Sequence, residues 1–498
     1  MSLKLSAAAP KAAEADVLAL LVSHEGWAAQ AQAQLGGDFG VGLVELAQAE
    51  GFEGRPGQQF TAPSFGALSA RRVLLLGIGD EALPHDMIKD VGGRAAKAAA
   101  STRATSLAVW AAWEGGALGA DAARAAALVG EGMALGAYRF DRYMSVKEGE
   151  TPRRLTSFAL LAGDHGAALD GVVARTEALV AGVLLARDLG NEPPQVCTPD
   201  YLADAGRRLA EAHGFEAVIL DRAQIDAKGM NLLSAVGRGS DIGPRFIHLK
   251  YTGAGEIGRR LAFVGKGVTF DTGGYSLKIS GSMVGMHLDM CGAAAVFGAA
   301  ETIGRLAPAG VEIHFIVPTA SNMVSAGAFT VNEIIRGYGG KTVEITNTDA
   351  EGRLLLADAL AYASELGVDE IVDLATLTGA CVVALGEQYS GLFSNDDAMA
   401  GRITAASKAA GERMWHMPLD AKLRDKLKSP VADMKNACTD RWGGAITAAL
   451  FLKEWIGDKR WTHLDIAGPA FLENDSPIGQ KGASGVGVAT LVGYTLGT

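Results

Sequence analysis

EITNTDAEGRLLLADAL, residues 344–360, leads from a strand-like segment through a charged turn into a helix-like segment rich in Leu and Ala. A strand followed closely by a helix is typical of α/β folds, in which ligands bind at the carboxyl ends of strands. If the turn is extended, Asp349, Glu351 and Arg353 point to one side, because side chains alternate along an extended chain. The stretch therefore predicts an α/β fold with two carboxylates and a guanidinium group in one pocket.

Two further segments place charged residues beside apolar sequence at predicted strand ends. They are VGKGVTFDTGGYSLK at 264–278 and MHLDMCGAAAV at 286–296. Carboxylates held close together raise one another's pKa unless a cation lies between them. Four carboxylates are enough to bridge two divalent ions about 3.5–4 Å apart, and oxygen ligands without His or Cys favour Mn²⁺, Mg²⁺ or Zn²⁺. The candidate charged residues of the three segments are Lys266, Asp271, Lys278, Asp289, Asp349, Glu351 and Arg353.

Each of these residues also has a purely structural interpretation. An Asp before an Ala-rich helix, as at Asp289, is most often an N-cap. Asp349 and Glu351 can equally cap the helix that begins near residue 354. Lys266 between two glycines can be a solvated turn residue, and Gly273–Gly274 favours a tight turn with positive φ over a phosphate-binding loop. The metal site is preferred because these residues occur together at neighbouring strand ends.

The first third of the chain alternates between apolar strand-like runs and helical patterns. Strands are expected at 71–80, 106–112 and 157–163, with an Ala-rich helix at 120–140. Such alternation predicts a βαβ arrangement with a mainly parallel sheet. A second helical pattern follows at 169–189 and is stopped by Gly190 and two prolines.

That helix predicts a connector between two α/β domains. We place an N-terminal α/β domain at 1–168, a linker helix at 169–192 and a C-terminal domain at 193–498. In the C-terminal domain, helices are expected after Asp289, after Arg353 and from about Ile446. Its expected strands are 245–252, 260–270, 312–320, 342–348, 370–379 and 461–468.

Composition excludes several classes of protein. The chain of 498 residues carries 45 basic and 56 acidic residues, a net charge of −11 that disfavours nucleic acid as a partner. Its four cysteines form no C-x-x-C pair, and no apolar stretch is long enough to span a membrane, so a cytoplasmic protein without membrane contact is expected. The sequence also lacks H-E-x-x-H, G-x-S-x-G and P-loop motifs.

NTDAEGRL (347–354) matches the signature octapeptide of the leucyl aminopeptidase (cytosol aminopeptidase) family without a substitution, and the chain resembles bacterial members of that family. The resemblance implies two α/β domains joined by a helix. It also implies a C-terminal catalytic domain with a mixed, mostly parallel central sheet flanked by helices. Further motifs in the family's order are NEPP…TP (191–199), VGKGVTFDTGGYSLK (264–278), LDMCGAAAV (288–296), DLATLTGA (373–380), GGAITAALFL (443–452) and HLDIAG (463–468).

The resemblance implies a two-metal exopeptidase that removes N-terminal residues, Leu among the favoured ones. A tightly held ion takes the amine of Lys266 with Asp271, Asp289 and Glu351, and a more exchangeable ion takes Asp271, Asp349 and Glu351, with help from the backbone carbonyl of Asp349. An amine binds a metal only when neutral, so Lys266 must lose its proton. The ions are expected to be Mn²⁺ or Zn²⁺, with Mg²⁺ possible, and a water between them attacks the peptide carbonyl.

The resemblance also implies roles for residues that hold no metal. Lys278 polarises the carbonyl and stabilises the oxyanion, and Arg353 binds a bicarbonate that carries a proton to the leaving amine. Small or apolar residues form the pocket for the first side chain: Met286, Thr376, Gly379, Ala467 and Ala470. Peptides are the expected partners, and family members assemble as homo-hexamers.

Two other functions stay open from the sequence. A metal-dependent dipeptidase, of the kind that acts on Cys-Gly, would use the same carboxylates on shorter substrates. Some relatives also act as DNA-binding regulators, which the acidic composition and the lack of a basic tail speak against.

Overall fold

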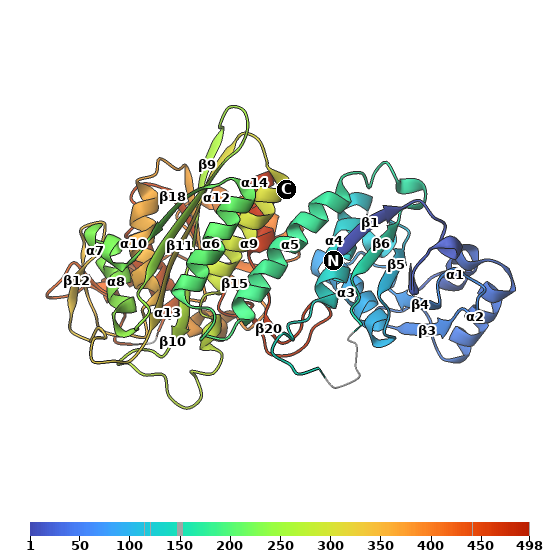
Figure 1. The fold of residues 1–498 in the computed structure, drawn as a ribbon, viewed down its shortest axis with the longest axis horizontal. Helices are drawn as coiled ribbons and strands as arrows, with labels where there is room; N and C mark the ends of the chain where they lie inside the picture. The colour runs from blue at the N-terminus through green and yellow to red at the C-terminus, as the bar shows by residue number, and fades with distance from the viewer. Residues whose placement is uncertain (114, 120, 147–152, 441, 498) are drawn as a thin grey trace. The chain divides into compact units, whose positions relative to one another are not determined.

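The computed structural model describes residues 1–113, 115–119, 121–146, 153–440 and 442–497. Two compact units divide the chain: Met1–Val180 with Asn474–Lys481, and Ala181–Glu473 with Gly482–Thr498. Both are α/β units, as the ribbon in Figure 1 shows. Among the described residues, no helix combines the length and apolar character needed to cross a bilayer.

The first unit is built on a six-stranded sheet in the order β1-β6-β5-β2-β4-β3, in which every neighbouring pair except β3–β4 is parallel. The strands expected at 71–80, 106–112 and 157–163 are confirmed as β4, β5 and β6. Its strands are β1 Ser2–Ser6, β2 Val17–Val22, β3 Gln59–Pro63, β4 Arg72–Gly77, β5 Ser106–Trp110 and β6 Ser157–Leu161. Its helices are α1 Trp27–Leu35, α2 Gly37–Ala49, α3 His85–Ser101 and α4 Ala122–Ala137.

Helices α4 and α5 correspond to the two helical patterns of the sequence. The first residue of the pattern at 120–140 lies outside the described residues. α5, Val172–Asn191, crosses the division between the units at Val180 and ends just before Pro193. The limits 1–168, 169–192 and 193–498 for the domains stay a prediction.

The second unit contains a nine-stranded mixed sheet in the order β16-β15-β18-β14-β9-β11-β8-β7, with β10 paired to β11. Strands β18, β14, β9 and β11 run parallel to one another, and β10 is parallel to β11. The mixed, mostly parallel sheet expected for this half is confirmed. Its strands are β7 Glu216–Leu220, β8 Arg245–Thr252, β9 Arg259–Gly265, β10 Gly267–Asp271, β11 Val311–Asn322, β14 Glu370–Ala375, β15 Ser390–Ser394, β16 Met414–His416 and β18 Arg460–Asp465.

Two expected strands differ from the structure. The run at 260–270 forms two strands, because the chain leaves β14 at Lys266 and β10 pairs with β11 alone. The run at 342–348 yields only β13, Thr342–Glu344, which belongs to a separate three-stranded sheet with β12, Ile334–Arg336, and β17, Met434–Lys435. The remaining residues of that run form the turn that enters the next helix.

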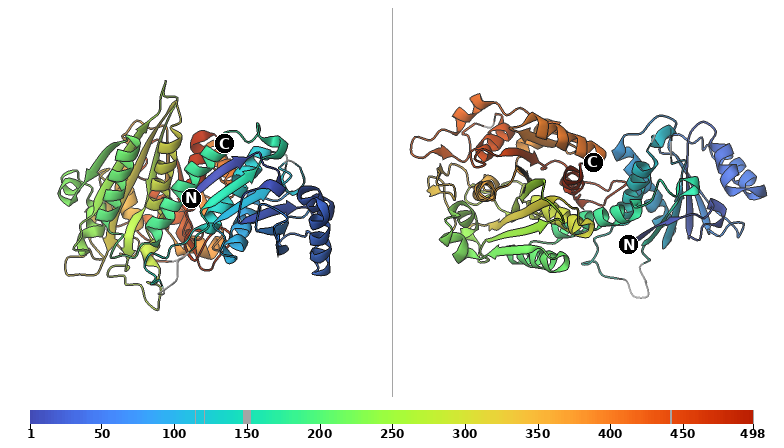
Figure 2. Two further views of the ribbon diagram at one scale, coloured as in Figure 1. Left: turned by 45° about the vertical axis from the view of Figure 1, so that its right-hand side comes forward. Right: turned by 90° about the horizontal axis from the view of Figure 1, so that it is seen from above.

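Helices cover both faces of the nine-stranded sheet, as Figures 1 and 2 show. One face packs against α6, α9 and α12, with α14 lying on α9 and α12, and the opposite face packs against α8, α10 and α13. Buried Leu, Ile, Val and Phe side chains fill the space between the sheet and helices α8, α10 and α13. The helices are α6 Pro199–His213, α7 Arg222–Ala227, α8 Asn231–Val236, α9 Cys291–Leu306, α10 Gly352–Ser364, α11 Gly379–Leu385, α12 Asp397–Ala409, α13 Gly444–Lys453 and α14 Val488–Leu496.

Candidate active site

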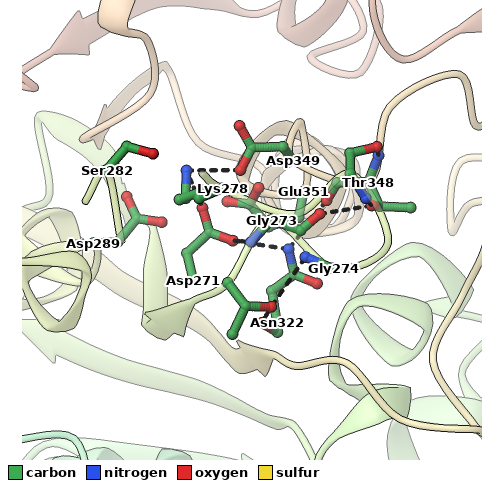
Figure 3. Close-up of polar contacts among 12 residues, drawn as sticks. Asp271, Gly273, Gly274, Lys278, Ser282, Asp289, Asn322, Thr348, Asp349 and Glu351 are labelled. Carbon is green, nitrogen blue, oxygen red and sulfur yellow. Dashed lines mark hydrogen bonds and ion pairs between the residues drawn. The ribbon is translucent and has the colours of Figure 1, made fainter. Parts of the chain in front are cut away.

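The charged residues singled out in the sequence meet at the carboxyl ends of β9, β10 and β14. Lys266 joins β9 to β10, and Asp271 is the last residue of β10. Asp289 follows a short 3-10 helix, Met286–Leu288, and Glu351 directly precedes α10. Parallel strands bring their carboxyl ends to one edge of the sheet, so segments distant in the sequence face one another there (Figure 3).

Lys266 is buried at the centre of this group, with 3% of its surface exposed. Its Nζ lies 2.7 Å from Asp289 Oδ1 and 3.1 Å from Glu351 Oε1, and it donates to the carbonyl oxygen of Thr376 at 3.0 Å. Burial lowers the pKa of Lys266, but the neighbouring carboxylates outweigh burial and raise it. The interpretation of Lys266 as a solvated turn residue is therefore wrong.

Gly352 makes room for this lysine. A Cβ atom at Gly352 would lie 2.4 Å from Cε and 2.6 Å from Nζ of Lys266. Any larger side chain would push the lysine away from Glu351, which is the preceding residue.

Lys278 forms a second cationic contact, with the other pair of carboxylates. Its Nζ lies 2.8 Å from Asp271 Oδ2 and 2.7 Å from Asp349 Oδ1. The contact with Asp349 is drawn in Figure 3. Burial lowers the pKa of Lys278, but the two carboxylates outweigh it and raise the pKa above its usual value. Each lysine thus pairs with two of the four acidic residues.

Three of the four carboxylates form a compact buried cluster. One ligand atom each from Asp271, Asp289 and Glu351 lies within 4.8 Å of the others. Burial raises the pKa of Glu351 and of Asp289, and Asp271 adds to both shifts. Asp289 Oδ2 and Glu351 Oε2 are buried and accept no hydrogen bond from the described residues. Buried carboxylate oxygens without donors fit a divalent cation, because a cation supplies the missing charge and ligand contacts.

The capping alternatives for the acidic residues are not supported. Met290, not Asp289, is the N-cap of α9, and Asp289 Oδ1 accepts a hydrogen bond from Thr376 Oγ1 at 2.7 Å instead. Glu351 occupies the N-cap of α10 but makes no capping hydrogen bond. The predicted positive φ of Gly273–Gly274 is confirmed, at 84° and 61°.

The expectation of an extended chain from Asp349 to Arg353 is wrong. Glu351 has helical angles, with φ −80° and ψ −36°, and α10 begins at the next residue. Asp349 instead follows a turn in which its own N–H donates to Asn347 Oδ1 at 2.9 Å. The turn, rather than strand alternation, brings Asp349 and Glu351 to the same site.

Arg353 lies in the first turn of α10 and is 9% exposed. Its Nη1 donates to the carbonyl oxygen of Asn436 at 2.8 Å. Its Nε is buried and makes no hydrogen bond within the described part of the chain. A buried guanidinium N–H without an acceptor fits an anion, since unsatisfied donors are costly.

Sequence reasoning missed the residues that orient the carboxylates. Asn322, the last residue of β11, donates from Nδ2 to Asp271 Oδ1 at 2.8 Å and to the Thr348 carbonyl oxygen at 3.1 Å. Thr348 Oγ1 donates to the Gly273 carbonyl oxygen at 2.6 Å, which ties the two loops together. Both residues were detectable as polar groups at a strand end and inside the NTDAEGRL motif.

The five residues expected to form the pocket for the first side chain come from three segments. Thr376 contacts both Lys266 and Asp289, as described above. Met286 precedes Asp289 in the short 3-10 helix, and Gly379 begins α11. The buried Asp465, another residue that sequence reasoning missed, accepts from the N–H groups of Leu377 and Ala467, both at 3.2 Å, and so links two of the segments. Ala470 is buried and lies three residues after Ala467.

Comparison with known families agrees with this geometry. The catalytic-domain model of the cytosol aminopeptidase family matches residues 184–492, and the family's N-terminal-domain model matches residues 19–147. The chain belongs to the cytosol aminopeptidase family. It is therefore a metallo-aminopeptidase, an enzyme that hydrolyses peptide bonds.

Similar proteins cover nearly the whole chain. A probable cytosol aminopeptidase from a Synechococcus species is 44% identical over 92% of both chains, and one from Rippkaea orientalis is 40% identical over 97% of this chain and 96% of the relative. A variant of tomato leucine aminopeptidase superposes with a TM-score of 0.88 at 34% identity, covering 100% of this chain and 97% of the other. The bottromycin maturation enzyme BotP in complex with Mn gives 0.84 at 36% identity, covering 97% and 100%.

Proposed function

We propose that this cytosol aminopeptidase family member binds two divalent ions and removes N-terminal residues from peptides, with Leu and other medium-sized apolar residues favoured. The observation that carries the proposal is the buried cluster of Asp271, Asp289 and Glu351, two of whose oxygens lack donors among the described residues. Mn²⁺ or Zn²⁺ suits these ligands, with Mg²⁺ as a third choice.

One ion would be held by Lys266, Asp271, Asp289 and Glu351, and the second by Asp271, Asp349 and Glu351. Bound there, the ions would lower the pKa of a water molecule and polarise the scissile carbonyl group. The pairing of Lys278 with Asp271 and Asp349 supports the second set, because it shows that a cation is accommodated between these two carboxylates.

Two cationic side chains have separate roles in the proposal. Lys278 stabilises negative charge on the carbonyl oxygen of the substrate, from a position that its loop fixes next to Asp271. Arg353 is a fixed cation whose Nε can bind an anion, and bicarbonate is the anion we propose, as a carrier of protons when it is bound. All four carboxylates contact lysines or belong to the cluster, so none is left to serve as a general base.

The preference for Leu rests on the segments that carry Met286, Thr376, Gly379, Ala467 and Ala470. These residues are small or apolar, and Thr376 anchors them directly beside Asp289. One methylene group in such a pocket changes substrate selectivity by only about 1–3 kcal/mol, so several apolar N-terminal residues should be accepted.

The test is metal removal and restoration. Chelator-treated enzyme should lose the hydrolysis of Leu-p-nitroanilide and regain it with Mn²⁺ or Zn²⁺, and calorimetric titration should give two ions per chain. The melting temperature should rise with each ion added, because a ligand of the native state stabilises it by mass action. Full activity after complete metal removal, or binding of a single ion, would contradict the proposal.

A further inference from the structure

We propose that His463, held by Asp373, is a positioning residue of the aminopeptidase site. The two residues open the motifs HLDIAG (463–468) and DLATLTGA (373–380), and the two-metal proposal gives neither of them a role. The inference deepens the proposed function and rests on it, because it concerns the alignment of the segments that hold Lys266 and form the pocket for the first side chain.

Asp373 and His463 form a buried pair between two neighbouring strands. They are partners in the parallel register of β14 and β18, and both are 0% exposed. His463 Nδ1 lies 2.6 Å from Asp373 Oδ1, and Trp461 Nε1 donates to Asp373 Oδ2 at 2.6 Å. An ionised carboxylate only accepts, so Nδ1 carries the proton of this hydrogen bond. Both oxygens of Asp373 are therefore fixed by side chains of β18.

The other ring nitrogen of His463 is placed differently. Nε2 is buried and makes no hydrogen bond within the described residues. The ring stacks on Phe393 and Trp461, with interplanar angles of 28° and 13°. Nε2 can therefore gain or lose its proton without breaking a hydrogen bond in the described part of the chain and without turning the ring. The charge of the pair changes while its geometry is held.

On the β14 side, the residues that follow Asp373 hold Lys266. The N–H of Lys266 donates to the carbonyl oxygen of Leu374 at 3.0 Å, and its Nζ donates to that of Thr376 at 3.0 Å. Thr376 Oγ1 also donates to Asp289. Both ends of the lysine thus depend on the position of the three residues directly after Asp373.

On the β18 side, the pair is followed by Asp465, the residue that links the segments of the substrate pocket. Asp465 is the register partner of Ala375, and the N–H of Ile466 donates to the carbonyl oxygen of Ala375 at 2.8 Å. Asp465 Oδ2 also accepts from Thr378 Oγ1 at 2.6 Å. A displacement of β18 along β14 would therefore move the pocket segments and the carbonyl groups that hold Lys266 relative to one another.

Three charged groups act on the imidazole: Asp373 from β14, Asp465 from β18 and Arg353 from α10. Burial lowers the pKa of His463, but the charge and hydrogen bond of Asp373, with a contribution from Asp465, outweigh burial and raise it, while Arg353 opposes the rise. The folded pKa is thus above the ordinary value of about 6.5. The attraction between imidazolium and carboxylate is fully present below about pH 6.5 and is lost as the pH rises through the folded pKa.

The test is the pH dependence of Leu-p-nitroanilide hydrolysis by the Mn²⁺-loaded enzyme, from about pH 6 to about pH 10. In the wild type, kcat/KM should fall on the alkaline side with a midpoint equal to the pKa of His463. NMR of labelled histidine rings gives that pKa independently, with the signal identified by its proximity to the Trp461 ring.

Two variants separate positioning from a merely structural role. His463→Gln should lower kcat/KM by up to about 100-fold, the cost of a displaced site, and should lack the alkaline fall. Asp373→Asn keeps one acceptor oxygen but removes the charge that raises the pKa of His463. It should move the kinetic midpoint and the NMR midpoint to lower pH together.

His248→Gln is the matched control, because His248 is also a buried histidine of this sheet but contacts His314 instead of a strand of the site. It should leave the alkaline fall as in the wild type. An active wild type without the fall, kinetic and NMR midpoints that differ, or variants that only melt at lower temperature and keep the fall at the same pH would overturn the inference alone. A wild type inactive at every pH would overturn the proposed function with it.

Discussion

At the scale of single residues, the site depends on uncharged groups that orient the charged ones. Asn322 is 1% exposed and holds one oxygen of Asp271 through its amide. Such partners of metal ligands typically change metal affinity or activity by about 10–100-fold when they are removed. Asn322→Ala should therefore weaken Mn²⁺ binding by this factor, measured by calorimetric titration.

A matched control for this prediction is Asn231→Ala. Asn231 also donates from its amide to a backbone carbonyl oxygen, that of Arg336, and this hydrogen bond involves none of the four site carboxylates. Its removal should leave the Mn²⁺ affinity unchanged. If Asn322→Ala folds and binds Mn²⁺ as tightly as the wild type does, Asn322 has no positioning role.

At the scale of elements, the antiparallel pair β8–β11 contains two buried histidines in contact. His248 Nε2 and His314 Nδ1 are 2.8 Å apart, and Tyr362 and Glu312 hold their outer nitrogens at 3.1 and 3.3 Å. Burial lowers the pKa of His248 to about 3, and His314 and Lys250 add to the shift.

This shift predicts that the pair destabilises the fold in acid. In the unfolded chain the pKa of His248 is near 6.5, so the unfolded state gains a proton that the folded state excludes. Stability should fall as the pH decreases from about 6.5 towards 3, by at most about 1.4 kcal/mol per pH unit from this group. Urea unfolding of His248→Gln should show a shallower slope in this range. The exposed His416, changed in the same way, should leave the slope as it is in the wild type.

At the scale of the whole molecule, the resemblance to the family predicts a homo-hexamer. Sedimentation should give a particle of six chains, and the assembly should not require metal, because the ligands of the proposed ions all come from one chain. A stable monomer with full peptidase activity would contradict the prediction.

A cytoplasmic location is likewise predicted and is tested by fractionation of cells.

The sequence predicted the second unit better than the first, for physical reasons. Strands β8 and β14 contain short apolar runs interrupted by few polar residues. The predicted limits of β8, 245–252, match the structure, and the predicted start of β14 at residue 370 matches as well. β2 was not identified, although all six of its residues are buried, because a short run preceded by an Ala-rich segment resembles a helix equally well.

The candidate residues of the site were identified from the sequence because charged residues beside apolar sequence are rare. Their geometry could not be predicted in the same way. The turn that joins Asp349 to Glu351 depends on hydrogen bonds from distant segments, such as Asn436 Nδ2 to the carbonyl oxygen of Asn347 at 2.6 Å. Local alternation contains no information about such contacts. For the same reason the role of Asp465, which accepts hydrogen bonds from Leu377 and Ala467, could not be assigned from its neighbours in the sequence.

The return of residues 474–481 to the first unit has a consequence for synthesis on the ribosome. In that unit Lys97 Nζ donates to the carbonyl oxygen of Gly479 at 3.2 Å, and the N–H of Phe140 donates to Gln480 Oε1 at 3.0 Å. At about 5–20 residues per second, roughly 20 to 70 seconds pass between the emergence of Phe140 and that of its partner. The first unit is therefore translated first but completed almost last. In a nascent chain stalled before residue 474, Lys97 and the N–H of Phe140 lack these partners and stay hydrogen-bonded to water.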